Sequence, residues 1–131
     1  LTPGTPEWQW VPQLKPAANE TLIPKGFNSA FEQTTLDAEL ARLGATHITL
    51  AGAATGWCIR ATAYGALDRG YDLTLVKDAH TTETLDLGTR KVEAASVVDD
   101  LNIAMKWLSY PGRKNGTATA EITPLHSSDA P

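Results

Sequence analysis

Cys58, the only cysteine in the sequence, lies where an apolar run gives way to a small-residue turn and then to a helical pattern. The free N–H groups and the dipole at the start of a helix favour the thiolate, which is the nucleophilic form of cysteine. The same N–H groups can bind the oxyanion that forms when a thiolate attacks a carbonyl. The pattern therefore predicts acyl-transfer chemistry. Position alone favours the alternative, in which Cys58 is a small buried side chain.

Lys25 is the second residue of interest, because it follows a short apolar run at residues 20–24 and precedes a glycine. This pattern predicts a short strand that ends at Lys25. Another predicted strand ends at Lys77 and Asp78. Ligands of an open parallel sheet bind outside the carboxyl ends of its strands. We therefore expect Lys25, the turn at residues 52–58, and Lys77 with Asp78 to meet at one cleft.

Strands and helices alternate along the middle of the sequence. A hydroxyl cap at Thr34 or Thr35, followed by leucines at helical spacing, predicts a helix that ends at Gly44. The other predicted elements are a strand at 47–53, a helix at 58–69 closed by Gly70, a strand at 71–76 and a helix at 93–108, with a short strand at 96–98 as an alternative. This alternation indicates an α/β fold in which helices cover a parallel sheet.

The two ends of the sequence differ from this middle part. Residues 1–18 are rich in proline and predict a surface loop in which Trp8, Trp10 and Leu14 point inward. Residues 113–131 are polar and contain proline and glycine, which predicts a tail or arm.

Composition excludes several classes of partner. The 131 residues are 42% hydrophobic and 20% charged, which is typical of one soluble globular domain. A net charge of -4 without a basic stripe argues against a nucleic-acid partner. The longest apolar run, 48–54, is far shorter than the roughly 20 residues that span a membrane. One cysteine cannot form an internal disulfide, so we expect a cytoplasmic location.

The run GAATGWCIRATA at residues 52–63 closely resembles the G-x-x-T-x-x-C-V-x-x-T-A pattern of the isochorismatase-like cysteine hydrolases. The segments at 66–72 and 76–79 are also similar to that family, and PKGFNSAF at 24–31 resembles its lysine-containing motif. The resemblance extends from near Leu1 to about Gly112, so we expect a hydrolase domain at 1–112.

This resemblance implies both a fold and a reaction. The fold would be a three-layer, Rossmann-like parallel sheet with helices on both faces. The reaction would be hydrolysis of a C–N bond in a small amide, carbamoyl or ureido compound through a thioester, without a cofactor. Cys58 would be the nucleophile, and Lys25 would polarise the reacting groups. A cis Ala53–Ala54 bond would let the amides of Ala54 and Cys58 form the oxyanion hole.

Two aromatic residues are candidates for the substrate pocket. Trp57 lies within the turn, and Phe31 lies in the lysine-containing segment. For both residues, packing beneath the turn or against a subunit is an equally good expectation.

The sequence also departs from the family pattern. The third catalytic group of the family is an aspartate at the end of the first strand, and this sequence has no counterpart to it. We therefore expect the N-terminal strand region to be missing from this chain and to be supplied by a separate segment or by another subunit of a homo-oligomer. The alternative is a non-catalytic chain that acts in binding or oligomer assembly.

The three histidines do not have the spacing of metal ligands. We expect no metal site, and structural roles for His47, His80 and His126.

Overall fold

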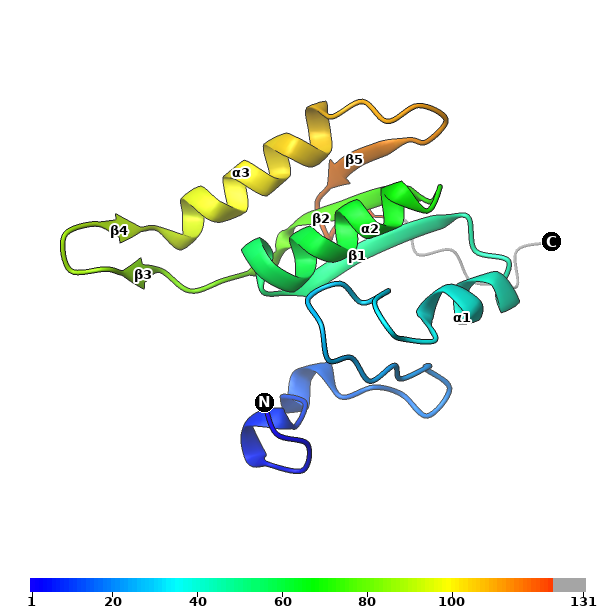
Figure 1. The fold of residues 1–131 in the computed structure, drawn as a ribbon, viewed down its shortest axis with the longest axis horizontal. Helices are drawn as coiled ribbons and strands as arrows, with labels where there is room; N and C mark the ends of the chain where they lie inside the picture. Colours follow the sequence, from blue (N-terminus) through cyan, green and yellow to red (C-terminus); the bar gives the residue numbers. More distant parts are fainter. Residues whose placement is uncertain (124–131) are drawn as a thin grey trace.

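The computed structural model describes residues 1–123, which form a parallel sheet and the helices that connect its strands (Figure 1). The sheet contains β1 (His47–Ala53), β2 (Asp72–Thr81) and β5 (Asn115–Ala118), in the order β1-β2-β5. Both strand pairs are parallel. The expected α/β fold with a parallel sheet is confirmed.

Helices α2 (Arg60–Asp68) and α3 (Ala94–Trp107) make the two crossovers of the sheet. Both bury residues in one hydrophobic cluster with Leu73 and Leu75 of β2. The buried face of α2 consists of small residues and one leucine: Thr62, Ala63, Gly65, Ala66 and Leu67. Small side chains allow α2 to lie close to the sheet, which fixes the start of the helix against the end of β1.

The predicted helix after Thr34 is confirmed as α1 (Leu36–Arg42). Thr34 Oγ1 accepts a hydrogen bond from the Leu36 N–H at 3.3 Å, which satisfies one of the free donors at the helix start. The helix ends before Gly44, whose φ of 67° suits a residue without a side chain.

The prediction of a strand at residues 20–24 is wrong. This stretch has no regular secondary structure and no strand partner within residues 1–123. It is attached to α1 instead, because the Thr21 hydroxyl donates to Glu39 Oε1 at 2.9 Å. A short apolar run forms a β-strand only when another strand pairs with it, and residues 1–123 provide no such partner for residues 20–24.

The predicted end of β2 is also wrong, because the strand continues to Thr81. Its register against β1 shifts between Leu50 and Gly52, after which His80 pairs with Gly52. Lys77 and Asp78 therefore lie within the strand and do not mark its carboxyl end.

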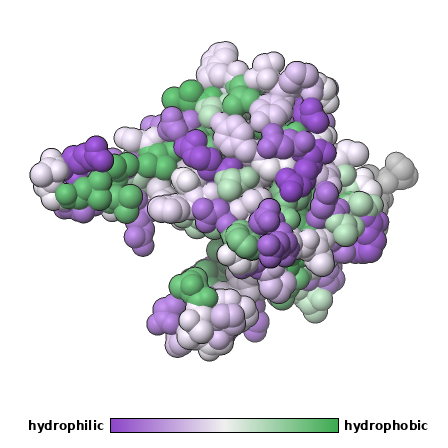
Figure 2. Space-filling model, in the orientation of Figure 1, coloured by the Kyte–Doolittle hydropathy of each residue, from purple (hydrophilic) through white to green (hydrophobic). Residues whose placement is uncertain are grey.

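The segment after β2 forms a hairpin arm, with β3 (Leu85–Asp86) and β4 (Lys91–Val92) paired antiparallel. This arm projects from the body of the molecule and carries hydrophobic residues on its surface (Figure 2). Leu85 and Leu87 are about half exposed. The arm leads into α3, so the alternative strand at 96–98 is wrong.

The C-terminal part of the sequence contributes to the sheet beyond the boundary expected at residue 112. β5 pairs with β2 from Asn115 to Ala118, in a stretch where a polar tail was expected. Asn115 Nδ2 also donates to the carbonyls of Met105 and Leu108, at 2.8 and 2.7 Å. These bonds join β5 to the end of α3.

The N-terminal segment contains two short 3-10 helices, η1 (Pro6–Trp8) and η2 (Pro12–Leu14). The expectation that its large apolar residues point inward is wrong, since Trp8 is 48% and Trp10 60% exposed. Proline fixes the local backbone here, but no other element covers these side chains within the described chain. No helix among residues 1–123 combines the length and apolar character that a bilayer crossing requires.

Candidate active site

The turn after β1 places Cys58 at the start of a helix. The Ala53–Ala54 bond is cis, as the resemblance implied. The Ala54 carbonyl accepts hydrogen bonds from the N–H groups of Trp57 and Ile59, at 3.0 and 3.1 Å. One π-helical turn, η3 (Thr55–Ile59), then leads directly into α2. Cys58 therefore lies in the first turn of a continuous helical segment.

Lys25 and Cys58 are brought together from segments that are far apart in the sequence. Lys25 Nζ donates to Cys58 Sγ at 3.3 Å. The cysteine is half-buried, and the lysine is exposed. An ammonium group at this distance stabilises a thiolate, which is the nucleophilic form of cysteine. Lys77 and Asp78, predicted for the same cleft, do not join this pair: Asp78 Oδ1 accepts from the Ala120 N–H at 2.8 Å.

Asn28 is a third residue at the sulfur atom. Its Oδ1 lies 4.0 Å from Cys58 Sγ. Sequence reasoning did not assign a role to Asn28, although the residue lies within the lysine-containing motif. The motif itself was the signal that could have pointed to it.

The segment that carries Lys25 and Asn28 is attached to the same helix as Cys58. The Ala30 N–H donates to Thr62 Oγ1 at 3.0 Å, and Thr62 is four residues after Cys58. One helix therefore positions both sides of the candidate site.

Phe31 lies in the core and does not line a pocket near Cys58. It is 5% exposed and belongs to the hydrophobic cluster beneath α2. Its ring stacks on Tyr71 at a centroid distance of 6.0 Å, and the Arg69 guanidinium lies 4.5 Å above it. The packing alternative for Phe31 is the one that the structure shows.

Trp57 lies beside a cavity of about 450 Å³ that opens next to the turn. The indole is 58% exposed. The cavity is lined by Ala53, Ala54, Trp57, Thr81, Thr82, Glu83 and Leu85. It therefore adjoins Ala54, one of the two residues whose amides were expected to form the oxyanion hole.

Three groups with shifted pKa values form hydrogen bonds that join separate segments of the fold: Glu39, Tyr71 and Tyr110. Hydrogen bonds from Arg42 and then from Thr21 lower the pKa of Glu39 from 4.5 to about 2. Hydrogen bonding to Asp37 raises the pKa of Tyr71, and bonding to Asp68 raises that of Tyr110.

The two histidines in the described chain have different surroundings. His47 is exposed, and its Nε2 lies 2.9 Å from Thr74 Oγ1. His80 is 6% exposed and lies in β2, beyond residue 76 where the predicted strand ends. His126 lies outside the described residues. Among residues 1–123, no group of three or more His, Cys, Asp or Glu side chains is arranged to hold a metal ion.

Comparison with known proteins identifies the family of this chain. The family model described as the isochorismatase domain matches residues 1–99. The chain belongs to the isochorismatase family. It is 30% identical over 97 residues to a ureidoacrylate amidohydrolase of Variovorax paradoxus, covering 74% of this chain and 37% of that protein. It is 32% identical over 78 residues to a maleamate amidohydrolase of Pseudomonas putida, covering 60% of this chain and 37% of that enzyme.

A solved cysteine hydrolase from Pseudomonas syringae is similar in fold, with a TM-score of 0.82 and 25% sequence identity. The match covers 93% of this chain and 56% of that protein. The chain thus spans little more than a third of the two curated relatives and just over half of this solved structure.

Proposed function

We propose that the protein containing this chain hydrolyses a C–N bond of a small amide, carbamoyl or ureido compound, with Cys58 as the nucleophile. The observation that carries the proposal is the 3.3 Å distance between Lys25 Nζ and Cys58 Sγ at the start of a helix. The two curated relatives described above are amidohydrolases by name, which supports the same bond type.

The proposed reaction has two stages. In the first, the Cys58 thiolate forms a C–S bond with the substrate carbonyl carbon, and the N–H groups of Ala54 and Cys58 bind the resulting oxyanion. The C–N bond then breaks, and the nitrogen leaves as ammonia or an amine after gaining a proton. In the second stage water adds to the thioester, the C–S bond breaks, and the acid is released while the thiolate is restored.

Lys25 supports this reaction by donating a hydrogen bond to Cys58 Sγ and by polarising the reacting groups. The proton that the leaving nitrogen gains, and the proton that water loses, require a general acid and base, and the family resemblance implies an aspartate in this role. Within residues 1–123 the polar side chains bonded to Cys58 Sγ are Lys25 and Asn28, so we assign this carboxylate to a region outside the described chain.

The cavity beside Ala54 and Trp57 supports a small substrate. Its volume of about 450 Å³ lies in the range of small-molecule sites, roughly 300 to 1,000 Å³. Trp57 and Leu85 provide apolar surface, while Thr81, Thr82 and Glu83 provide hydrogen-bonding groups. We also propose a cytoplasmic location, in line with the single cysteine.

A second candidate function is binding or oligomer assembly without catalysis. It is favoured by the same absence of a carboxylate at Cys58 Sγ within residues 1–123. Without a proton acceptor, a lysine–cysteine pair would form a reactive thiol but would not complete a hydrolytic cycle.

The deciding experiment measures ammonia or amine release by the intact protein from a panel of small amides, ureas and carbamoyl compounds. We expect Cys58→Ala to lower kcat/KM by about 10³-fold or more on any substrate that turns over. Acid quenching during turnover of a slow substrate should trap an acyl group on the Cys58 peptide, detected as added mass. Full activity in Cys58→Ala would contradict the proposal. An intact protein with a folded site but no turnover on the panel would favour the non-catalytic function.

A further inference from the structure

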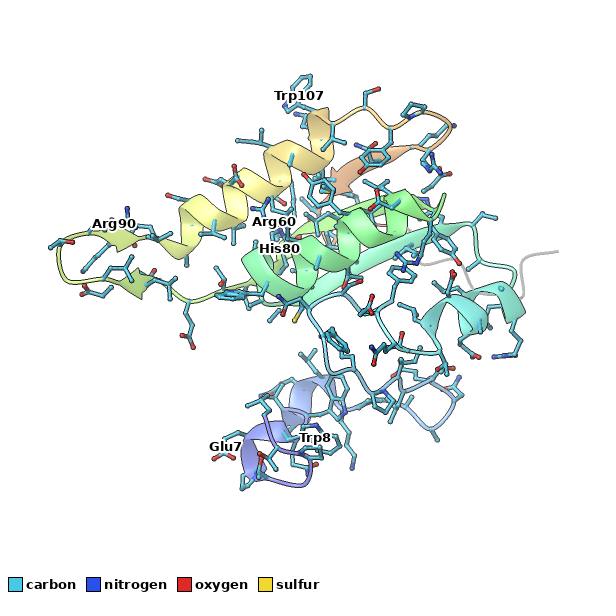
Figure 3. The ribbon with its side chains drawn as sticks, in the orientation of Figure 1. Glu7, Trp8, Arg60, His80, Arg90 and Trp107 are labelled. Carbon is cyan, nitrogen blue, oxygen red and sulfur yellow. The ribbon has the colours of Figure 1, made fainter. Side chains whose placement is uncertain are left out.

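His80 is a buried titratable residue that the proposed reaction does not use. It lies in β2 just beyond the register shift, and it is 6% exposed. Both of its ring nitrogens have partners: Nδ1 lies 2.8 Å from Thr55 Oγ1, and Nε2 lies 2.9 Å from Asn102 Oδ1. Figure 3 shows His80 between the start of α2 and the neighbouring α3.

The side-chain amide of Asn102 determines the direction of the hydrogen bonds in this network. Its Nδ2 donates to the Lys77 carbonyl at 3.1 Å, which leaves Oδ1 as the acceptor that faces His80. In a neutral imidazole, Nε2–H then donates to Asn102 and Nδ1 accepts from the Thr55 hydroxyl. The network therefore connects β2, α3 and the turn through donors and acceptors that are all matched.

Thr55 is the residue through which the network reaches the candidate site. It is fully buried, and it follows the Ala53–Ala54 bond directly. It begins the helical turn that presents Cys58 three residues later. The same turn also packs closely on α3, because a Cβ at Gly56 would lie only 3.3 Å from Val97 Cγ1.

We propose that Thr55, His80 and Asn102 are positioning residues that set the Cys58 sulfur against Lys25 and against the amides of the turn. They do not touch the substrate or the sulfur. This inference rests on the proposed function, because it assigns the network a role in that reaction. The hydroxyl of Thr55 holds the first residue of the turn to the sheet and to α3, so that Cys58 and the Ala54 amide keep one relative position. A misplacement of about 1 Å can lower a rate roughly 100-fold.

The test compares matched substitutions in the intact protein with two readouts. The first readout is the rate at which iodoacetamide alkylates Cys58 at pH 7, followed on the Cys58 peptide by mass spectrometry. This rate reports the reactivity of the Cys58 sulfur beside Lys25 and needs no amidase activity. The second is the separation of kcat from KM on a small amide.

Thr55→Val removes the hydroxyl at nearly constant volume, and Thr55→Ser keeps it. We expect Thr55→Val to slow alkylation at least about threefold and to lower kcat about 10- to 100-fold with little change in KM. Thr55→Ser should restore both rates to within about threefold of the parent. Thr74→Val is the control, because it removes the threonine from the exposed His47–Thr74 pair between β1 and β2 and should change neither rate.

His80 allows a second, independent comparison. His80→Asn places an amide oxygen near the Nδ1 position and can accept from Thr55, whereas His80→Gln places an amide nitrogen near Nε2 and retains only the bond to Asn102. We expect His80→Asn to alkylate faster than His80→Gln. If Thr55→Val does not fold, this pair decides the question.

Equal alkylation rates in Thr55→Val and Thr55→Ser, or in His80→Asn and His80→Gln, would overturn the positioning role. Failure of the proposed function gives a different pattern. In that case the parent protein would hydrolyse no amide, while the alkylation rates of the variants would still separate as expected.

Discussion

At the scale of single residues, the candidate site depends on one pair. Lys25 and Cys58 are separated by 33 residues in sequence, but Nζ and Sγ lie 3.3 Å apart. Their meeting requires that the loop carrying Lys25 is held on the helix carrying Cys58. The Ala30–Thr62 hydrogen bond and the burial of Phe31 provide that attachment.

Replacing Lys25 tests the electrostatic role of this pair. Lys25→Met keeps most of the length of the side chain but removes its charge, so Cys58 Sγ loses the ammonium group that donates to it. We expect alkylation by iodoacetamide at pH 7 to slow at least about threefold and amide turnover to fall about 100-fold or more. Lys114→Met, at an exposed lysine near β5, is the matched control. Equal alkylation of Lys25→Met and parent protein would show that the contact has no influence on the thiol.

The two phenylalanines allow a test of whether Phe31 is a core residue or a pocket residue. Phe31 is 5% exposed, whereas Phe27 in the same segment is 49% exposed. We expect Phe31→Ala to lower the free energy of unfolding by about 3 to 5 kcal/mol, as for other buried aromatic truncations. Phe27→Ala should cost no more than about 0.5 kcal/mol. Urea denaturation measures both. A change in KM for Phe31→Ala without loss of stability would instead support the pocket role.

At the scale of elements, α1 holds the loop before Lys25 through Glu39. Arg42 donates to both carboxylate oxygens of Glu39, at 2.6 and 3.0 Å, and Thr21 donates to one of them. These bonds lower the pKa of Glu39 to about 2. Because the folded pKa is depressed, the stability that the carboxylate contributes is present above about pH 4.5. It is lost as the pH falls through about 2.

The lowered pKa of Glu39 predicts how the stability of Glu39→Gln depends on pH. The variant should be less stable than the parent at pH 7, and the difference should shrink as the pH falls from 4.5 toward 2. The effect is small, because the Arg42 side chain that bonds to Glu39 is 65% exposed to solvent. Urea midpoints at a series of pH values measure it, with Glu32→Gln as an exposed control. A difference that stays constant down to pH 2 would contradict the assignment.

Asn115 is the residue that joins β5 to α3. Its side-chain amide donates to two carbonyls at the end of that helix, Met105 and Leu108. We expect Asn115→Ala to lower the free energy of unfolding by about 1 to 3 kcal/mol, because the two acceptors lose their donor. Exposed Asn19→Ala serves as the control. If thermal unfolding shows no difference between these variants, β5 is not held through Asn115.

The sequence predicts the helices and β1 well because their patterns are local. Leucines at helical spacing define α1, and the β-branched run after His47 defines β1. The errors fall where pairing decides the outcome. Residues 20–24 lack a neighbouring strand. Strand β2 continues past residue 76 because it pairs again with β1 at Gly52. The polar run NGTA forms β5 because it pairs with the free edge of β2. None of these partners can be recognised from the local pattern alone.

In the candidate site, too, local motifs predict some residues, whereas others depend on contacts with residues distant in the sequence. Cys58, Lys25 and the cis Ala53–Ala54 bond follow from short motifs. Asn28 and His80 do not, because their importance depends on contacts with residues about 30 and 25 positions away. Phe31 is adjacent to the lysine segment in sequence but turns into the core.

At the scale of the whole molecule, β1 is an edge strand in the sheet that residues 1–123 form. No residue of β1 is fully buried, and β2 is its partner on one side only. Large apolar side chains are also exposed in the N-terminal segment: Trp8, Trp10, Val11, Leu14, Leu22 and Phe27. Unpaired strand edges and apolar surface of this extent favour association. We propose that in the intact protein another segment, or a second copy of the chain, pairs with β1.

This proposal predicts a difference between residues 1–131 expressed alone and the intact protein. The isolated chain should bind the dye ANS and self-associate in sedimentation, because β1 and the N-terminal apolar residues lack their cover. Its amidase activity should be at least about 10³-fold lower than that of the intact protein, because the carboxylate that completes the proton transfers is then absent. In the intact protein, the amide hydrogens at His47 and Thr49 should exchange more slowly than in the isolated chain, because these residues alternate with those that bond to β2 and so face the open edge of β1. A monomeric isolated chain that binds no ANS and hydrolyses amides at the rate of the intact protein would show that the described sheet and its lysine–cysteine pair are sufficient.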